Sequence, residues 1–104
     1  MYSDFVGRLV YGAMAQSFDI DDRALAHLRI VLSNKMRRAE PFFLHLPTSD
    51  GSGHRSVWIH PAVPMTLHFF GSRTPTINRH WVDALMDDAS GPHGLALGPE
   101  PAEV

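Results

Sequence analysis

Apolar residues recur at intervals of three and four along the stretch after Asp21, which is the period of an amphipathic helix. The stripe consists of Leu25, Leu28, Val31, Leu32 and Met36. Asp21 precedes it as an N-cap residue. The acidic side chains of residues 21 and 22 complement the positive end of the helix dipole. The basic side chains of residues 35, 37 and 38 complement its negative end. The sequence therefore predicts a helix that begins after Asp21, runs to about Arg38 and buries one face.

Alternation of apolar and polar residues predicts strands over much of the remaining chain. The predicted strands cover residues 4–11, 14–20, 42–46, 55–60 and 65–70, with a short edge strand at 95–97. Pro41 ends the first helix because it forces an extended backbone at the preceding residue. Pro61 and Pro64 bracket the turn between the fourth and fifth strands, and residues 49–54 form a flexible loop with two glycines.

A second helix is predicted from Thr74, which suits the N-cap, and Pro75, which suits the first helical position. Its apolar stripe is Trp81, Val82, Leu85 and Met86. The predicted order is therefore β-β-α-β-β-β-α-β, an α+β fold in which two helices cover one face of a mostly antiparallel sheet in a two-layer sandwich. Residues 1–98 form the single domain, and residues 99–104, with two prolines and two glutamates, form a flexible tail.

Composition limits the classes of function. At 104 residues the chain has room for one hydrophobic core. Cysteine is absent, which excludes disulfides and thiolate chemistry, and the formal net charge of -2 provides no global attraction to nucleic acid. No apolar run approaches the roughly 20 residues of a membrane helix, and residues 1–4 lack the features of a signal peptide. We therefore expect a cytoplasmic protein that does not bind membranes.

Aromatic residues and histidines alternate with aliphatic ones along the third to fifth strands. The set that suits the helix-covered core is Leu44, Val57, Ile59, Leu67 and Phe69. The opposite face would then present Phe43, His45, Trp58, His60, His68 and Phe70. A lone soluble domain rarely leaves large apolar side chains in one patch, so this face suits contact with another protein molecule. The predicted contact residues are Phe43, Trp58, His60, His68 and Phe70.

Two other interpretations of this face are open. Imidazole nitrogens are good metal ligands, and exposed aromatic rings can stack on nucleic-acid bases. No carboxylate accompanies the histidines, and their spacing matches no metal signature. We accordingly expect neither a metal nor another cofactor.

A second candidate site lies where residues 71–75 lead into the predicted second helix. Free backbone N–H groups and the helix dipole attract anions to such a point. The predicted ligands of a phosphate, a carboxylate or nucleic acid are Ser72, Arg73, Asn78 and Arg79. Alternatively, Arg73 pairs with an acidic neighbour and the loop is only a turn.

Catalytic motifs are absent from the sequence. It contains no Gly-x-Ser-x-Gly elbow and no phosphate-binding Gly-x-x-x-x-Gly-Lys-[Ser/Thr] loop. Asp21 and Asp22 are adjacent, so their side chains diverge on a helix and do not form an acid–base pair. The sequence predicts no catalytic residue and favours a protein that is not an enzyme.

Three motifs carry a family resemblance: the segment 18–28, the run Val57-Trp58-Ile59-His60-Pro61, and the segment 70–86. They resemble a family of short actinobacterial proteins, a domain of unknown function commonly labelled ATP-dependent DNA ligase. The matching positions are Asp22, Arg23, His27, Trp58, His60, Pro61, Gly71, Arg73, Asn78, Arg79 and Trp81. The label implies a DNA-associated accessory protein that binds nucleic acid through Arg73, Arg79 and the aromatic sheet face.

Ligases of that class take the adenylate on a lysine in a Lys-x-Asp-Gly motif. The only lysine here is Lys35, in the context Asn-Lys-Met-Arg, so the adenylation motif is missing. The leading hypothesis is therefore a non-catalytic binding module that acts through protein–protein contact and self-associates. Association with DNA is the alternative.

Overall fold

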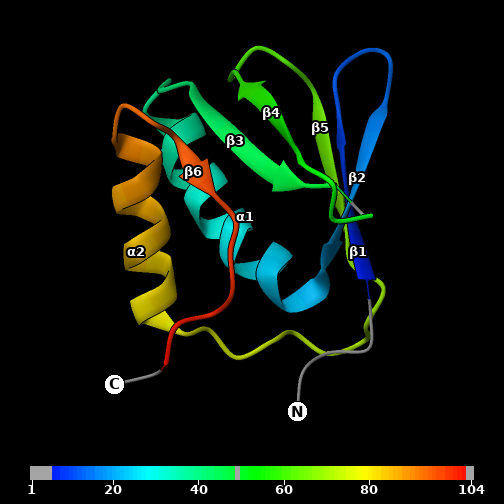
Figure 1. Ribbon diagram of the computed structural model, residues 1–104, viewed down its shortest axis with the longest axis vertical. Helices are drawn as coiled ribbons and strands as arrows, with labels where there is room; N and C mark the ends of the chain where they lie inside the picture. The colour runs from blue at the N-terminus through cyan, green and yellow to red at the C-terminus, as the bar shows by residue number, and fades with distance from the viewer. Residues whose placement is uncertain (1–5, 49, 103–104) are drawn as a thin grey trace.

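The computed structural model describes residues 6–48 and 50–102, which contain two helices and six strands (Figure 1). Their order confirms the predicted β-β-α-β-β-β-α-β pattern and the α+β class. The elements are β1 (Val6–Tyr11), β2 (Gln16–Asp21), α1 (Asp22–Arg37), β3 (Phe42–Pro47), β4 (His54–Ile59), β5 (Met65–His68), α2 (Arg79–Ser90) and β6 (Leu95–Ala96).

The strands divide between two sheets, where the sequence had suggested one. The first sheet has the order β2-β1-β5 and the second the order β4-β3-β6. All pairs are antiparallel except β3 with β6, which are parallel. β5 leaves its neighbour β4 and pairs with β1, with Leu67 opposite Leu9. The N–H of Gly12 donates to the carbonyl of Pro64 at 3.0 Å, so β5 begins beside the β1–β2 turn.

Tyr11 joins the two sheets through its hydroxyl group. This group donates to the carbonyl of Trp58 at 2.6 Å and accepts from the N–H of His60 at 3.0 Å. The two backbone groups belong to Trp58, near the C-terminal end of β4, and to His60, the first residue after it. The hydroxyl therefore substitutes for part of a strand ladder at the point where the first sheet meets the second.

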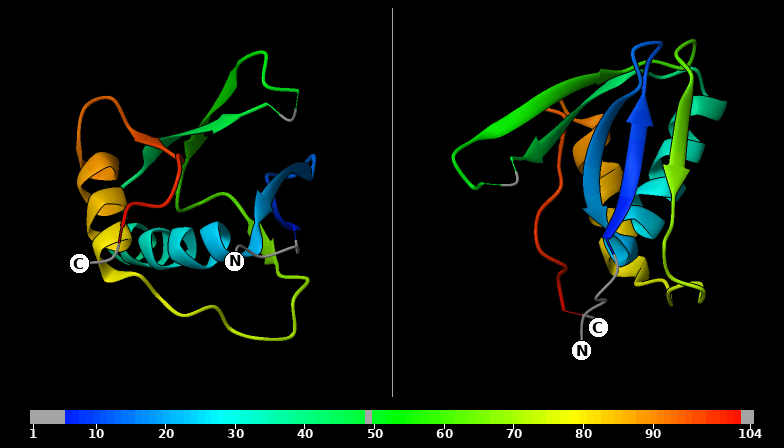
Figure 2. Two further views of the ribbon diagram at one scale, coloured as in Figure 1. Left: turned by 60° about the horizontal axis from the view of Figure 1, so that its bottom comes forward. Right: turned by 90° about the vertical axis from the view of Figure 1, so that its right-hand side faces the viewer.

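Each helix covers a different sheet. α1 packs against β1 and β2, α2 packs against β3 and β6, and the helices also contact each other. Figure 2 shows the sheets spreading apart on one side of the helices, with the β3–β4 hairpin extending outward. The most deeply buried apolar residues of this core are Leu9, Leu25, Leu28, Val31, Leu44, Ile59 and Leu95. No helix in the described part of the chain is both long and apolar enough to cross a membrane.

The predicted first helix is confirmed at both ends. The carboxylate of Asp21 accepts from the N–H groups of Arg23 and Ala24, at 3.1 and 3.2 Å, as an N-cap. At the other end Ala39 has a φ of 55°, and the N–H of Glu40 donates to the carbonyl of Lys35. This Schellman arrangement ends α1 before Pro41 is reached.

The predicted start of the second helix is wrong by one turn. Thr74 and Pro75 lie in an extended segment, and α2 begins after Asn78, whose side chain accepts from the N–H groups of His80 and Trp81. Asn78 is an equally good cap by residue type. Its backbone N–H also donates to His27 of α1, and this long-range contact places the helix start.

The predicted strands also change at their ends, most of all the second and the fifth. Met14, predicted within the second strand, lies in the β1–β2 turn and is 89% exposed. β5 ends at His68, before the predicted Phe70. The buried carboxylate of Asp22 accepts from the N–H of Phe70 at 3.3 Å and of Gly71 at 2.7 Å, which takes these groups out of the strand ladder. Residues 4 and 5 of the predicted first strand lie outside the described residues.

The loop expected to be flexible has internal contacts. Asp50 accepts from the N–H and the hydroxyl of Ser52 and from the hydroxyl of Thr48, and these bonds lower the pKa of Asp50 to about 2. The N–H of Thr48 donates to the carbonyl of Gly53 at 2.9 Å. Residue 49 lies outside the described residues.

Candidate functional site

The predicted alternation of the third and fourth strands is confirmed. Leu44 and Ile59 are buried, whereas Phe43 and Trp58 are 44% and 48% exposed. These exposed rings stand opposite one another on β3 and β4, with centroids 4.9 Å apart and planes at 60°. We refer to Phe43 and Trp58 as the aromatic pair. Its edge-on geometry is one of the two arrangements that aromatic quadrupoles favour.

The predicted continuous contact face is corrected to two groups on two sheets. The aromatic pair belongs to the second sheet, whereas His68 ends a strand of the first sheet. His68 and Phe70 stack with centroids 4.2 Å apart, and the guanidinium of Arg8 lies 5.9 Å from the Phe70 ring. Phe70 is 47% exposed, which is close to the exposure of the aromatic pair.

Two of the histidines on these strands have structural hydrogen bonds. Nε2 of His45 lies 2.7 Å from the carbonyl of His93, so it carries the proton, and Nδ1 accepts from the hydroxyl of Ser56 at 2.7 Å. Nδ1 of His60 accepts from the N–H of Ala62 at 3.0 Å. Across residues 6–48 and 50–102, no three histidine or acidic side chains are grouped to hold a metal ion.

A cavity of about 460 Å³ opens beside the aromatic pair, between the C-terminal ends of α1 and α2. Lys35 lines it but is only 4% exposed, because its ammonium group donates to Glu40 at 3.1 Å and to the hydroxyl of Ser90 at 3.0 Å. Arg38 lies 3.9 Å from the same Glu40 carboxylate. The cavity thus combines an aromatic rim with charges of both signs.

The predicted anion-binding residues do not converge on one point. Ser72 and Arg73 line a cavity of about 180 Å³ together with Arg29 of α1, and Asn78 and Arg79 are not among its lining residues. Arg79 is exposed at the start of α2. The structure therefore separates the four residues and places Arg29, which is not one of the predicted ligands, beside Ser72 and Arg73.

Asn78 binds an anion, but one that belongs to the chain itself. It is 1% exposed, and its side-chain oxygen caps α2 by accepting from the N–H groups of His80 and Trp81. Its amide nitrogen donates to Glu100 at 2.9 Å and to the carbonyl of Pro101 at 3.1 Å. With every polar atom engaged, Asn78 is structural. Its prediction as a ligand for an outside anion is corrected accordingly.

His27 connects α1 to the start of α2. It is fully buried, and its Nε2 accepts from the N–H of Asn78 at 2.8 Å. Nδ1 therefore carries the proton and donates to the carbonyl of Arg23 at 2.7 Å. The ring packs on Trp81 with centroids 4.5 Å apart. His27 is thus a fully satisfied core histidine.

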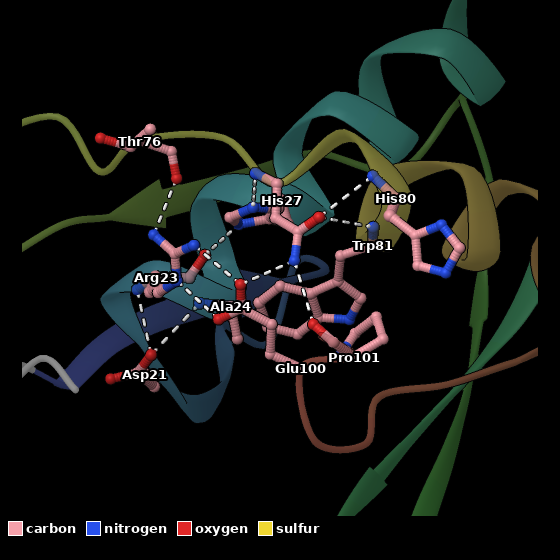
Figure 3. A network of polar contacts seen from close by, with 10 residues as sticks. Asp21, Arg23, Ala24, His27, Thr76, His80, Trp81, Glu100 and Pro101 are labelled. Atoms are coloured by element: carbon pink, nitrogen blue, oxygen red, sulfur yellow. Dashed lines mark hydrogen bonds and ion pairs between the residues drawn. The ribbon is translucent and has the colours of Figure 1, made fainter. Parts of the chain in front are cut away.

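Arg23 holds the segment after β6, which was expected to be flexible from residue 99. Its Nε and Nη2 donate to the two oxygens of Glu100 at 2.6 and 2.8 Å, and its Nη1 donates to the carbonyl of Thr76 at 2.7 Å (Figure 3). Hydrogen bonds from Arg23 and then Asn78 lower the pKa of Glu100 from 4.5 to about 2. This bidentate ion pair has no local sequence signature, because 77 residues separate its partners.

The Arg23–Glu100 pair predicts an acid-dependent loss of stability. The folded pKa of Glu100 lies below its ordinary value, so the contribution is complete above about pH 4.5 and is lost as the pH falls toward 2. Partial exposure limits the contribution to about 1–2 kcal/mol. Chemical denaturation should show that Glu100→Gln has a lower free energy of unfolding than wild type near neutral pH. This gap between the two proteins should close toward pH 2. A gap that does not change with pH would contradict the assignment.

Comparison with known proteins places the chain in a family without assigning an activity. No curated protein and no solved structure matches it. The profile of a domain of unknown function, DUF7882, matches residues 6–100, which include every described helix and strand and Glu100. The chain therefore belongs to the DUF7882 family of domains of unknown function.

Proposed function

We propose that this protein is a non-catalytic binding module that acts through protein–protein contact and self-associates through the aromatic pair. The observation that carries the proposal is the exposure of Phe43 and Trp58, at 44% and 48%, in contact with each other and beside an open cavity. Covering two such rings removes a large apolar area from water, which is the main favourable term in association.

The charges beside the pair support a second copy of this chain as the partner. Arg38 and Glu40 line the neighbouring cavity, with side chains 62% and 47% exposed and 3.9 Å apart. A two-fold contact brings the same patch of both subunits together. Arg38 of one subunit can then pair with Glu40 of its partner, so the patch is complementary to itself in charge as well as in apolar character.

The face of the second sheet is better suited to this contact than its edge. β4 is an outer strand, and outer strands can pair with a strand from another molecule. Here the hydroxyl of Tyr11 already bonds the carbonyl of Trp58 and the N–H of His60. Strand addition is therefore blocked at the C-terminal end of β4, whereas the rings of the aromatic pair stay available.

Sedimentation equilibrium tests the proposal. Wild type should approach twice its mass of 11.6 kDa as its concentration rises, and Phe43→Ser/Trp58→Ser should remain monomeric because the apolar contact is lost. Phe70→Ser is the matched control, since Phe70 is 47% exposed but lies in the other group. A monomeric wild type, or equal loss of association in the control, would contradict the proposal. Circular dichroism checks that both variants fold.

Association with DNA, the alternative drawn from the resemblance to proteins labelled ATP-dependent DNA ligase, has weaker support. Arg73 lines a cavity with Arg29, and Arg79 is not among the residues that line it. Lys35 is buried in bonds to Glu40 and Ser90, so the only lysine of the chain has a structural role. The geometry therefore favours the protein-contact function.

A further inference from the structure

A groove separate from the aromatic pair lies between α1 and the extended segment that leads to α2. It consists of two adjoining cavities of about 180 and 370 Å³, which share Ala26, Arg29 and Thr74. Figure 2 shows this segment following α1 on the side away from the sheets. The smaller cavity also has Phe69 and Arg73 in its wall, and the larger one has apolar side chains of its own.

The two arginines of the smaller cavity have no acidic partner among the described residues. The ion pairs in the described part of the chain involve Arg8, Arg23, Lys35 and Arg38. Among the residues that the structure describes, neither cavity is lined by an aspartate or a glutamate. Arg29 and Arg73 therefore contribute two positive charges to a small concave site, and guanidinium groups suit phosphate and carboxylate geometry.

Main-chain donors accompany these charges. Asp22 takes up the N–H of Phe70 and the N–H of Gly71, a residue in the wall of the smaller cavity. The N–H groups of the next three residues, 72–74, have no hydrogen-bond acceptor among residues 6–48 and 50–102. Main-chain N–H groups require a partner, from water or from a ligand. The hydroxyls of Ser72 and Thr74 add further donors to the cavity wall.

We propose that this groove binds a small organic phosphate, with the phosphate between Arg29 and Arg73. A phosphomonoester carries nearly two negative charges at neutral pH, which matches two arginines, whereas each phosphodiester of DNA carries one. The smaller cavity lies below the roughly 300 Å³ at which pockets enclose a whole drug-sized ligand. It therefore holds the phosphate group, and the organic part extends along Ile30 and Ile77 in the larger cavity.

Titration calorimetry of the full chain with phenyl phosphate tests this inference. Wild type should bind phenyl phosphate and fail to bind phenol, which lacks the anion. Arg29→Ala and Arg73→Ala should each lower the affinity by about 10-fold or more, as expected for loss of a charged hydrogen bond. Arg79→Ala is the matched control and should leave the affinity unchanged, because Arg79 is exposed but is not among the residues lining the cavity.

The pH dependence of phenyl phosphate binding provides a second readout. Affinity for phenyl phosphate should fall below about pH 6, where the phosphate becomes a monoanion. Binding that is insensitive to both arginine substitutions would overturn the inference, as would the absence of any binding. Binding of a single-stranded oligonucleotide without binding of phenyl phosphate would also overturn it and would assign the groove to nucleic acid. Because the aromatic pair is not part of the groove, Trp58→Ser should bind phenyl phosphate as wild type does.

Discussion

Replacing Gly7 with alanine is expected to destabilise the fold by about 3 kcal/mol, at the upper end of what overpacking usually costs. A Cβ at this position of β1 would lie 2.7 Å from the Asp22 carboxylate, 2.7 Å from the Leu25 side chain and 2.9 Å from the carbonyl of His68. The last contact is backbone, so it cannot move away easily. Displacing Asp22 would also disturb its bond to the N–H of Gly71.

Gly53→Ala is the matched control for this substitution. A Cβ at Gly53 would have no atom of the described residues within 4 Å, and its φ lies outside the left-handed region that favours glycine. Its effect should stay within about 0.5 kcal/mol. Urea denaturation of both variants measures the difference. Equal stability of the two variants would show that β1 does not approach the first turn of α1 as closely as described.

Replacing Asn78 with alanine should cost about 2–3 kcal/mol, since it combines loss of an N-cap with loss of buried hydrogen bonds. The N–H groups of His80 and Trp81 lose their acceptor, and Glu100 and Pro101 lose a donor. The bond from the main-chain N–H of Asn78 to His27 is retained, because it does not involve the side chain. The expected result is a weakened start of α2 with residues 100 and 101 held less firmly.

Asn78→Ser separates the contribution of the N-cap from that of the buried hydrogen bonds to Glu100 and Pro101. Serine is a good N-cap, so it should recover about 1 kcal/mol relative to alanine. It is too short to reach both Glu100 and Pro101, so stability should stay below that of wild type. Urea denaturation of the three proteins at neutral pH provides the comparison. Identical stabilities for the serine and alanine variants would argue against capping by Asn78.

Local sequence patterns predicted the elements whose signals lie within a few residues. The stripe from Leu25 to Met36 and the cap at Asp21 predicted α1 correctly, because period and capping are local properties. Alternation likewise predicted that Phe43 and Trp58 are exposed, whereas Leu44 and Ile59 are buried. These parts of the fold follow from the sequence alone.

Long-range contacts account for what the sequence did not predict. The division into two sheets depends on β5 pairing with β1 and on the hydroxyl of Tyr11, and neither has a local signature. The start of α2 depends on the bond between Asn78 and His27, since Thr74-Pro75 is an equally good helix start by residue type. Arg29 belongs to the candidate anion site because the segment after β5 passes beside α1, a contact with no local sequence signature.

Quenching of tryptophan fluorescence by acrylamide tests most directly whether the aromatic pair is the self-association surface. Trp58 is 48% exposed and Trp81 only 5%, so quenching of a monomer reports mainly Trp58. A Trp58→Phe variant supplies the background from Trp81. We expect the quenching constant of Trp58 to fall severalfold as the concentration rises, in step with the increase in mass. A Trp58 that stays equally accessible while the mass doubles would contradict the proposed surface, as would a mass that never rises.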